Sequence, residues 1–478
     1  MIQISVLQER AAATDLTDCA RNDSGLAEMV VALFYDQYRY VPDRGWMAWA
    51  GTHWMPDSAA SIIEAVATTL DFMVVAADRL SPDGTGPKGE GKSERDKFLA
   101  WVSTCGNTRV LYAVEKRLQT WPKIVARSED WDADPYALTH QSGTTNLRTE
   151  LFEPHNPKDL ITHCAPADPI LAGHGERWSA FLEQVLPSPE LRAYTQRAIG
   201  CSIIGKQKDH VIFMATGGGG NGKGTLFRAI KAAIGEYYSA ISSNMLIEAQ
   251  SERHTTEIAD LMGRRLCVSS EIPSGKFLDE TKVKELTGND QLTARFMRKD
   301  NFRFQPTHTL WICANRKPRI KGTDNGIWRR IKVITFNVTI APEDMDKDLD
   351  DKLEAERDVI LAWCIEGARL YHTIGLGTCD EVVAATGDYR KDEDFLGMAL
   401  QELCVFGPHE LVTKKVFRAA LDQYYLDNGL PHAPSDPTLA RDFESRGIDS
   451  KRTKMARYWT GIRMRHNLDA DDSADLRD

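Results

Sequence analysis

A glycine-rich stretch lies between a strand-like and a helix-like segment, and it constrains the fold of this chain more than any other feature. The apolar run 211–215 is soon followed by four consecutive glycines and Asn221-Gly222-Lys223, and the apolar residues of 226–234 have helical spacing. In such a strand–loop–helix unit, backbone N–H groups and the helix N-terminus bind phosphate, and the lysine reaches the β and γ oxygens. A solvent-exposed turn is the alternative, but it would not need both flanking elements. We predict contacts to nucleotide phosphates from Gly217, Gly218, Gly219, Gly220, Asn221, Gly222, Lys223, Gly224 and Thr225.

The residue after the lysine departs from the simple phosphate-loop pattern. A Ser or Thr that holds Mg²⁺ is expected there, but this chain has Gly224 and places Thr225 one residue later. The same Lys-Gly-Thr ending occurs in adenylate kinases, so we expect ATP binding, whereas a direct bond between Thr225 and Mg²⁺ stays open. A second stretch, 86–93, fits the letters of the phosphate-loop pattern, but it follows a Ser- and Gly-containing segment instead of a strand. We interpret it as a solvated linker.

Composition narrows the class of protein. A chain of 478 residues is long enough for about two to four domains, and it has no apolar run that could span a bilayer. The N-terminal residues lack the charged start and apolar core of a signal peptide. The nine cysteines are dispersed without a Cys-x-x-Cys pair, which favours reduced thiols over disulfides or zinc. We expect a cytoplasmic protein, in the host cytoplasm if a phage encodes it, without a membrane partner.

Basic residues are concentrated in two parts of an acidic chain. The formal net charge is −10, yet residues 295–332 contain eleven Lys and Arg against two acids, and residues 449–465 contain six against one. Segment 341–358 is the reverse, with nine acids and three bases. Localised basic patches suit contact with a polyanion such as nucleic acid. Charge runs are also common on solvated faces, so this pattern alone does not assign a ligand.

Three further motifs follow the phosphate loop in the order that a nucleotide hydrolase needs. The apolar strand 264–270 ends at Glu271, which is a candidate general base and, with Thr225, a candidate Mg²⁺ ligand. The apolar strand 307–314 ends at Asn315, whose amide can donate to the γ-phosphate or to the attacking water, although a turn-forming Asn is the alternative. Arg329 and Arg330 precede a third strand, and arginines at a neighbour's active site can stabilise transition-state charge. We predict catalytic roles for Glu271, Asn315, Arg329 and Arg330.

The motif set resembles superfamily 3 helicases, and more narrowly the branch with poxvirus primase–helicases and phage or plasmid replication proteins. The resemblance rests on the stretches 263–271, 284–290, 304–306, 310–315 and 328–330. It implies an α/β P-loop core of the AAA+ type, a hexameric ring and movement along single-stranded DNA, usually 3′ to 5′. By this resemblance Lys223 is the phosphate lysine, Glu271 the Walker B acid and Asn315 the sensor. Arg329 or Arg330 is then the arginine finger.

The same resemblance matches residues 284–290 with an additional family motif, which a hairpin follows. From the residues alone, 293–297 and 301–304 can pair around a basic turn at 297–300. Side chains projecting from such a turn into a ring's channel could grip successive phosphates. We therefore predict contacts to single-stranded DNA from Lys284, Arg298 and Lys299, and an exposed charged turn is the alternative.

The remaining segments have weaker patterns. We predict a mainly helical N-terminal domain at 1–175 for oligomerisation or for admitting DNA, the ATPase at 176–340, a helical connector at 341–393, a winged helix at 394–467 and a disordered acidic tail at 468–478. Near residue 50 we predict a hairpin whose tryptophans fill a small core; stacking on bases is the less favoured alternative. In the winged helix, duplex phosphates would contact Lys451, Arg452, Lys454 and Arg457.

The leading hypothesis is an ATP- and Mg²⁺-dependent DNA helicase that acts on single-stranded and forked DNA as a homo-oligomer, in replication of a phage or other mobile element. One alternative is an origin-binding or loading protein that uses ATP only for assembly. Another is a nucleotide kinase, which the chain length and the C-terminal segment disfavour. Asp132-Ala-Asp134 has the letters of a primase pair but stands before Pro135 in a loop-like segment without a suitable His strand. We therefore expect a separate primase or other replication proteins as partners.

Overall fold

The computed structural model describes residues 3–83, 91–170, 175–248, 256–270, 272–273, 275–295, 297, 300–322, 325–430 and 432–465. It divides into two compact units. The first unit lies within Met1–Pro318 and Arg329–Val383, and the second lies within Arg319–Trp328 and Ala384–Asp478. In the described residues no helix is both long and apolar enough to cross a membrane.

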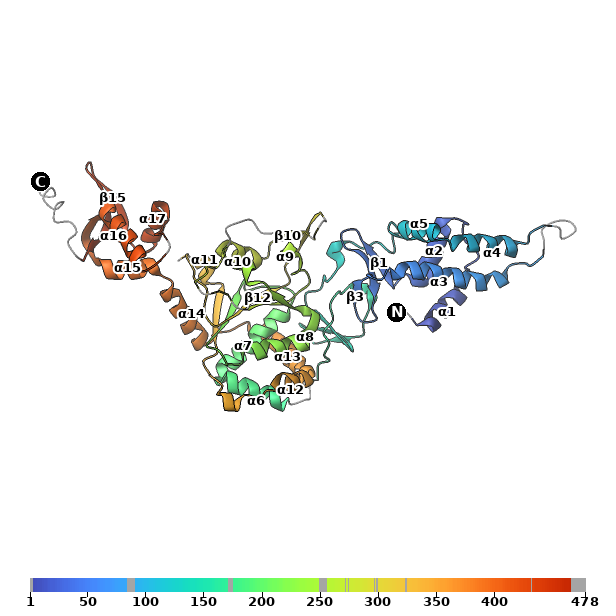
Figure 1. Ribbon diagram of the computed structural model, residues 1–478, viewed down its shortest axis with the longest axis horizontal. Coiled ribbons are helices and arrows are strands. Elements are labelled where there is room, and N and C mark those ends of the chain that lie inside the picture. Colours follow the sequence, from blue (N-terminus) through green and yellow to red (C-terminus); the bar gives the residue numbers. More distant parts are fainter. Residues whose placement is uncertain are drawn as a thin grey trace. The chain divides into compact units, whose positions relative to one another are not determined.

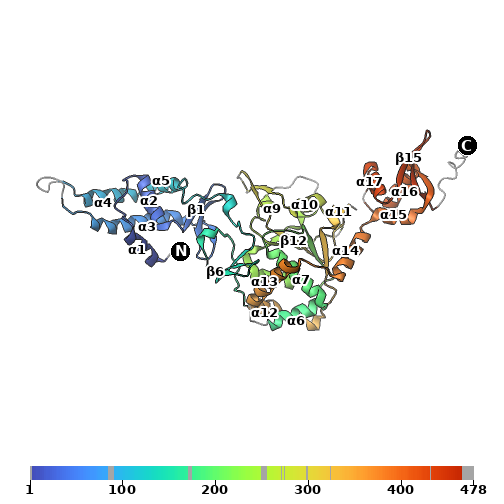
Figure 2. The ribbon, with the colours of Figure 1, turned by 180° about the vertical axis from the view of Figure 1, so that it is seen from behind.

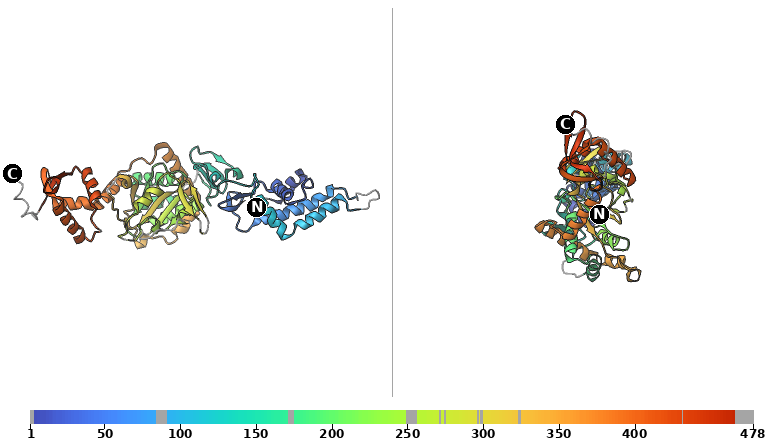
Figure 3. Two further views of the ribbon diagram at one scale, coloured as in Figure 1. Left: turned by 90° about the horizontal axis from the view of Figure 1, so that it is seen from above. Right: turned by 90° about the vertical axis from the view of Figure 1, so that its left-hand side faces the viewer.

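The N-terminal part of the first unit is a helical bundle with a small sheet. Its helices lie alongside one another (Figure 3): α1 (Ile4–Ala13), α2 (Asp23–Phe34), α3 (Ser61–Ala76), α4 (Glu94–Cys105) and α5 (Thr108–Leu118). Its antiparallel sheet has the order β1 (Tyr38–Val41), β2 (Gly45–Trp49) and β3 (Trp54–Pro56). Trp49 pairs with Trp54, and Trp54 is fully buried with its ring 5.6 Å from that of Trp131. The predicted hairpin and its small core are confirmed.

A second antiparallel sheet joins this bundle to the large sheet of the same unit. Its strands are β4 (Ala137–His140), β5 (Gly143–Asn146) and β6 (Phe152–Glu153). The backbone N–H of Gly205 donates to the Pro135 carbonyl at 2.8 Å, and the buried Arg265 guanidinium donates to the Ala137 carbonyl. The Tyr237 hydroxyl donates to the His163 carbonyl at 2.9 Å. These bonds attach segment 131–168 to the large sheet.

The large sheet is parallel and has the order β13-β7-β12-β9-β8. Its strands are β7 (Ile212–Thr216), β8 (Tyr238–Ile241), β9 (Leu266–Ser270), β12 (Thr309–Ala314) and β13 (Ile331–Thr335). All five residues of β7 are buried and four are apolar, as expected for a parallel strand covered on both faces. An α/β core with a parallel sheet is therefore present.

Helices cover this sheet. Figures 1 and 2 both show α7 and α13 on one side of β12 and α10 on the other, and Figure 1 shows α8 on the side of α7 and α13. The helices of this part are α6 (Glu176–Val185), α7 (Pro189–Ile203), α8 (Lys223–Ile234), α9 (Thr256–Ala259), α10 (Glu280–Leu286), α12 (Leu349–Ala355) and α13 (Arg357–Ile374). One continuous core contains side chains of α6, α7, α8 and α13 together with strand residues such as Phe213 and Trp311.

A separate hairpin follows α10. Strand β10 (Leu292–Arg295) pairs antiparallel with β11 (Asn301–Phe304), and Arg295 lies opposite Asn301. The predicted hairpin is confirmed, although its first strand begins and ends earlier than the predicted 293–297. Met297 in the connecting turn is 77% exposed.

Helix α14 (Asp380–Asp392) begins in the first unit and continues into the second from Ala384. The second unit also contains α11 (Asn325–Trp328), α15 (Phe395–Leu403), β14 (Cys404–Thr413), α16 (Lys414–Asp427), α17 (Asp436–Ser445), β15 (Asp449–Arg452) and β16 (Arg457–Met464). Its antiparallel sheet has the order β14-β16-β15. The side chain of Thr413 caps α16 by accepting from the Val416 N–H at 3.3 Å. Gly429 and Gly447 follow the two helices with positive φ angles of 61° and 74°, a conformation that favours glycine after a helix.

Candidate active site

The strand order brings the two most informative motifs together. Because β7 and β12 are parallel neighbours, the residues after their carboxyl ends meet at one edge of the sheet. Residues 217–222 follow β7 and lead directly into α8, whereas Asn315 follows β12. The predicted strand–loop–helix unit is present, with Gly222 at the N-cap position of α8.

Two glycines of this loop are required by its backbone and its close packing. Gly217 has φ of 151°, and a Cβ atom there would lie 2.2 Å from the Phe336 carbonyl oxygen. Gly222 has φ of 82°, and a Cβ atom there would lie 2.4 Å from a methyl of Val185. Nothing lies within 4 Å of a Cβ atom built at Gly218 or Gly219. Close packing thus accounts for two glycines, and the other two keep the loop's outer side open to approach.

Lys223 is the centre of the loop. It is 95% buried, and its ammonium donates to the carbonyls of Gly217 at 2.9 Å and Gly218 at 3.0 Å. It also donates to the side-chain oxygens of Asn221 at 2.8 Å and Asn315 at 3.2 Å. Burial lowers the pKa of Lys223, and the neighbouring Cys313 opposes that shift. The site therefore holds one cation surrounded by neutral oxygens, an arrangement that suits an anionic ligand.

A cavity of about 570 Å³ adjoins the loop. Apolar side chains of α6 and of segment 340–349 line it, together with the Gln184 amide, the loop residue Gly220 and charged residues, which are Arg177, Arg228, Asp344, Asp346, Lys347 and Asp350. Thr225 also lines the cavity, but its hydroxyl accepts from Arg228 at 3.0 Å. Arg228 is itself ion-paired with Asp350 at 2.9 Å. The Thr225 hydroxyl thus belongs to this polar cluster.

The other predicted catalytic residues are placed as follows. Glu271 lies outside the described residues, and Ser270 ends β9 directly before it. Arg329 is exposed. Arg330 is half-buried; its guanidinium donates to the Thr287 hydroxyl at 3.1 Å, and its carbonyl accepts from Ile212 at 2.9 Å. The two arginines, equivalent in the sequence pattern, therefore have different surroundings.

Five of the seven predicted DNA contacts can be located in the described residues, one on helix α10 and four in the β15–β16 hairpin. Arg298 and Lys299 lie outside the described residues, and Lys284 on α10 is 3.8 Å from Glu280. In the second unit, β15 and β16 form a hairpin in which the predicted contacts are all exposed: Lys451, Arg452, Lys454 and Arg457. A charged hairpin thus stands in each unit.

Two stretches match functional motifs by their letters alone: 86–93 fits the phosphate-loop pattern, and Asp132-Ala-Asp134 fits the primase pair. The described residues of both have structural roles. Most of stretch 86–93 lies outside the described residues, but its serine, Ser93, is the N-cap of α4 and accepts from Asp96 N–H at 3.0 Å. Asp132 accepts twice from Thr162, at 2.8 and 2.6 Å. Asp134 accepts from the Tyr136 N–H at 2.9 Å. The carboxylates of Asp132 and Asp134, the two acids of the primase-like motif, thus both accept hydrogen bonds within the protein.

Sequence reasoning missed two features of the site. Asn221 is buried and donates to the Phe336 carbonyl at 3.0 Å, so it ties the loop to the end of β13. The acidic segment 341–358 appeared as a solvated run of charge, yet part of it lines the 570 Å³ cavity beside α6. Neither contact has a local sequence pattern, because each joins residues more than a hundred positions apart.

Residues 27–187 match the family described as D5 N terminal like, and residues 215–330 match a family of unknown function (DUF5906). The chain is 26% identical over 293 residues to a helicase-named protein of Acanthamoeba polyphaga mimivirus, covering 56% of this chain and 30% of the relative. It is 24% identical over 247 residues to a primase-named protein of African swine fever virus, covering 48% and 26%.

A helicase-named protein of Frog virus 3 is 26% identical over 275 residues, covering 52% of this chain and 28% of the relative. The chain therefore spans less than a third of the length of these relatives. Among solved structures, the apo structure of the NrS-1 C terminal region aligns with a TM-score of 0.44 and 11% identity, covering 74% of this chain and 89% of that one. The chain is thus similar in part to the D5 N terminal like family and to viral proteins named helicases and primases.

Proposed function

We propose that the chain is an ATP-dependent DNA helicase of superfamily 3, which acts as a hexameric ring moving 3′ to 5′ in the replication of a phage or other mobile element. The observation that carries the proposal is the contact between Lys223 and Asn315 across the neighbouring strands β7 and β12. A phosphate lysine beside a polar residue of the next strand is the arrangement needed to bind a γ-phosphate and to sense its loss.

ATP would bind with its phosphates on the 217–224 loop. Lys223 would exchange the carbonyls of Gly217 and Gly218 for phosphate oxygens, and Asn315 would orient the γ-phosphate or the water. The base would enter the adjoining cavity, where Phe181 and Met345 offer apolar faces and Gln184 an amide. Mg²⁺ would be held by the phosphates, with Glu271 and Thr225 as the candidate protein ligands. When bound, the ion would neutralise charge on the phosphates.

A ring assembly is supported by the exposed Arg329. An arginine finger acts on the nucleotide of a neighbouring subunit, so it must reach beyond its own protomer. Arg329 satisfies this requirement, whereas Arg330 is held by Thr287 within the same protomer. We therefore assign the finger to Arg329.

DNA would be contacted by two elements with different tasks. The β10–β11 hairpin, together with the predicted contacts Lys284, Arg298 and Lys299, would grip a single strand in the ring's channel. The second unit has the helix and strand order of a winged helix, and its β15–β16 hairpin would contact duplex phosphates. The protein would work in the cytoplasm, on forked DNA and beside a separate primase.

An ATP-dependent origin-binding or loading protein is the alternative, because a winged helix and a nucleotide site suit it equally. The hairpin that follows α10 favours a motor, since a loader needs no element that tracks along a single strand.

The test measures ATP hydrolysis with and without single-stranded DNA, and strand displacement on a 3′-tailed fork. Lys223→Ala is compared with the wild type and with Lys231→Ala, which removes an exposed lysine from the same helix. We expect DNA-stimulated hydrolysis and unwinding in the wild type and Lys231→Ala, and neither in Lys223→Ala. DNA binding with hydrolysis but no displacement by the wild type would favour the loader.

A further inference from the structure

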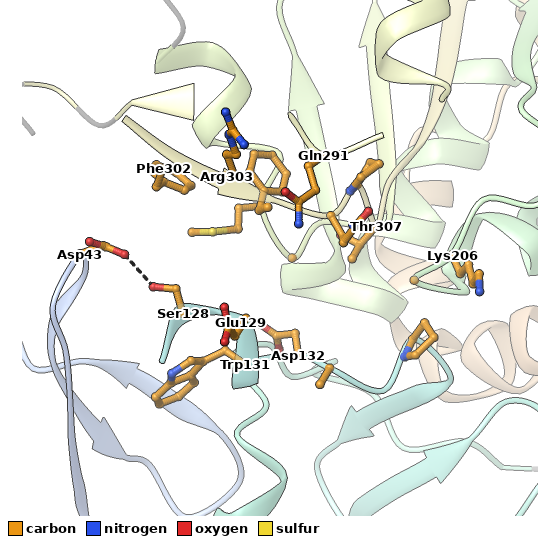
Figure 4. A pocket seen from close by; sticks show the side chains of 18 of the residues that line it. Asp43, Ser128, Glu129, Trp131, Asp132, Lys206, Gln291, Phe302, Arg303 and Thr307 are labelled. Atoms are coloured by element: carbon orange, nitrogen blue, oxygen red, sulfur yellow. Dashed lines mark hydrogen bonds between the residues drawn. The ribbon is translucent and has the colours of Figure 1, made fainter. Parts of the chain in front are cut away.

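A second cavity, of about 850 Å³, lies within the first unit, away from the phosphate loop. Figure 4 shows Gln291, Phe302 and Arg303 on one side of it, and Glu129, Trp131 and Asp132 on the other. One wall is strand β11 with its flanking residues, and the other is segment 128–135 with the turn between β1 and β2. We propose that this cleft binds a short run of single-stranded nucleic acid, with amides contacting base edges, Phe302 stacking on a base and cations holding phosphates.

The two walls are fixed with respect to each other. Beside the cleft, Gly205 donates to Pro135 at 2.8 Å, and Arg265 joins the carbonyls of Ala137 and Ile203. Arg44, from the β1–β2 turn, donates to the Met262 sulfur at 3.1 Å across the cleft. These contacts cross from the N-terminal part of the unit to the large-sheet part, so the cleft is a built feature of the unit.

Four residues with side-chain amides line the cleft, two of them in or directly after β11 and two before β10. All four amides are exposed and make no side-chain hydrogen bond to the described part of the chain: Asn289, Gln291, Asn301 and Gln305. A side-chain amide both donates and accepts, which matches the mixed donors and acceptors on a base edge. Such groups are suited to unpaired bases, whose Watson–Crick edges are accessible only in a single strand.

Three acidic and three basic residues line the cleft, so its formal charge is balanced. Each acidic residue has a hydrogen-bond or ion-pair partner, whereas two of the basic residues form no ion pair with the described residues. Asp43 accepts from Ser128 at 3.0 Å, Glu129 is 3.3 Å from Arg127, and Asp132 accepts from Thr162. Arg303 and Lys206 are exposed and form no ion pair with the described residues. These two are therefore available for phosphates at the edge of the cleft.

Phe302 supplies the stacking surface. It is half-buried on β11, between the exposed Asn301 and Arg303, and its ring lies 6.0 Å from that of Phe304. Stacking on an aromatic side chain contributes to single-strand binding for every base, whereas amide contacts favour some bases. Because the net charge of the lining is near zero, we expect the affinity of the cleft to depend on salt only weakly.

A peptide strand is the competing ligand, since among the described strands β11 pairs only with β10. Such a peptide would bind through backbone hydrogen bonds and would not require the side-chain amides or Arg303. The unpartnered amides and cations therefore favour nucleic acid.

This binding mode rests on the DNA-dependent function proposed above. The full-length protein is photo-crosslinked to a single-stranded oligonucleotide that carries 4-thiothymidine, and crosslinked peptides are mapped. Affinity is measured for Phe302→Ala, Arg303→Ala and the Gln291→Ala/Gln305→Ala double variant, with Arg109→Ala on α5 as the charge-matched control. We expect crosslinks within 289–307 or 128–135, and binding weakened about five- to a hundredfold by Phe302→Ala.

The variants at Arg303, Gln291 and Gln305 alter exposed side chains and keep the test valid should Phe302→Ala unfold. Wild-type DNA binding with crosslinks elsewhere and unchanged affinity in these variants would overturn the cleft and leave the helicase proposal standing. Absence of any DNA binding or DNA-stimulated hydrolysis by the wild type would overturn both. DNA binding unchanged in the variants, with a peptide strand competing for the cleft, would assign it to a protein partner.

Discussion

At the scale of single residues, the site depends on one buried cation and one amide. Lys223 is held by oxygens of its own loop and by Asn315, which comes from a strand almost a hundred residues later. The lysine could be predicted because its loop, strand and helix are contiguous in sequence. Its contact with Asn315 could be predicted only through the strand order, which local periodicity does not determine.

Asn315→Ala removes the amide while leaving the loop residues in place. We expect nucleotide affinity to change less than about threefold, whereas the rate of hydrolysis falls about a hundredfold, the usual effect of losing one donor to a transition state. Single-turnover hydrolysis and nucleotide titration separate the two quantities. Asn337→Ala is the control, since that exposed amide bonds only to Thr335 in the described structure. Equal losses in affinity and rate would assign Asn315 to binding alone.

Arg329 and Arg330 are adjacent, but the structure predicts different outcomes for their removal. Arg329→Ala changes an exposed side chain, so we expect unchanged thermal stability and loss of hydrolysis. In rings mixed with wild-type subunits, the inhibition should exceed the fraction of mutant subunits. Arg330→Ala leaves the buried Thr287 hydroxyl without this donor and should destabilise the protein by roughly 1–3 kcal/mol. Hydrolysis by mixed rings and thermal unfolding distinguish the two variants, and the reverse pattern would make Arg330 the finger.

At the scale of elements, the helices and hairpins that depend on neighbouring residues could be predicted, whereas the packing of segments distant in sequence could not. The ends of helices α16 and α17 follow from local residues, because Thr413 caps the first helix and Gly429 and Gly447 follow the pair. The β10–β11 hairpin was likewise predictable from alternation around a polar turn. The 570 Å³ cavity was not, since it forms where α6 meets segment 340–349, and no pattern in either segment specifies that packing.

The β15–β16 hairpin offers a test of duplex binding. If Lys451 and Lys454 each neutralise one phosphate, then alanine at either position should lower the slope of log K against log salt by about 0.9 on duplex DNA. Affinity for all sequences should fall alike, because phosphate contacts carry no sequence information. Lys391→Ala removes an equally exposed lysine from α14 of the same unit. Slopes unchanged from wild type in both hairpin variants would mean that the duplex binds elsewhere.

At the scale of the whole molecule, the boundary between the units does not follow the order of the chain. Segment 319–328 interrupts the first unit in sequence but folds with the second. Ile320 is fully buried, and its N–H donates to the Glu393 carboxylate at 2.8 Å. The Trp328 ring is 95% buried and meets Tyr389 edge-on at 5.2 Å. The ATPase and C-terminal segments predicted as consecutive domains therefore share this element.

Because segment 319–328 packs on α14 and Glu393, we expect the stability of a truncated chain to depend on whether it ends before or after these residues. A chain ending at residue 383 lacks Tyr389 and Glu393, so Trp328 and Ile320 lose their partners. Losing the packing of a buried aromatic residue costs roughly 3–5 kcal/mol, a large part of the stability of most domains. Because Trp328 directly precedes Arg329, this loss should also disturb the proposed finger.

A chain ending at residue 394 keeps both partners and is the matched control. We expect 1–394 to retain basal ATP hydrolysis and an unfolding midpoint close to that of the full chain, while 1–383 unfolds at least several degrees lower and hydrolyses ATP poorly. Differential scanning calorimetry and a hydrolysis assay without DNA measure both effects. Equal midpoints for the two truncations would show that segment 319–328 is stable without α14, and that the ATPase needs no support from the second unit.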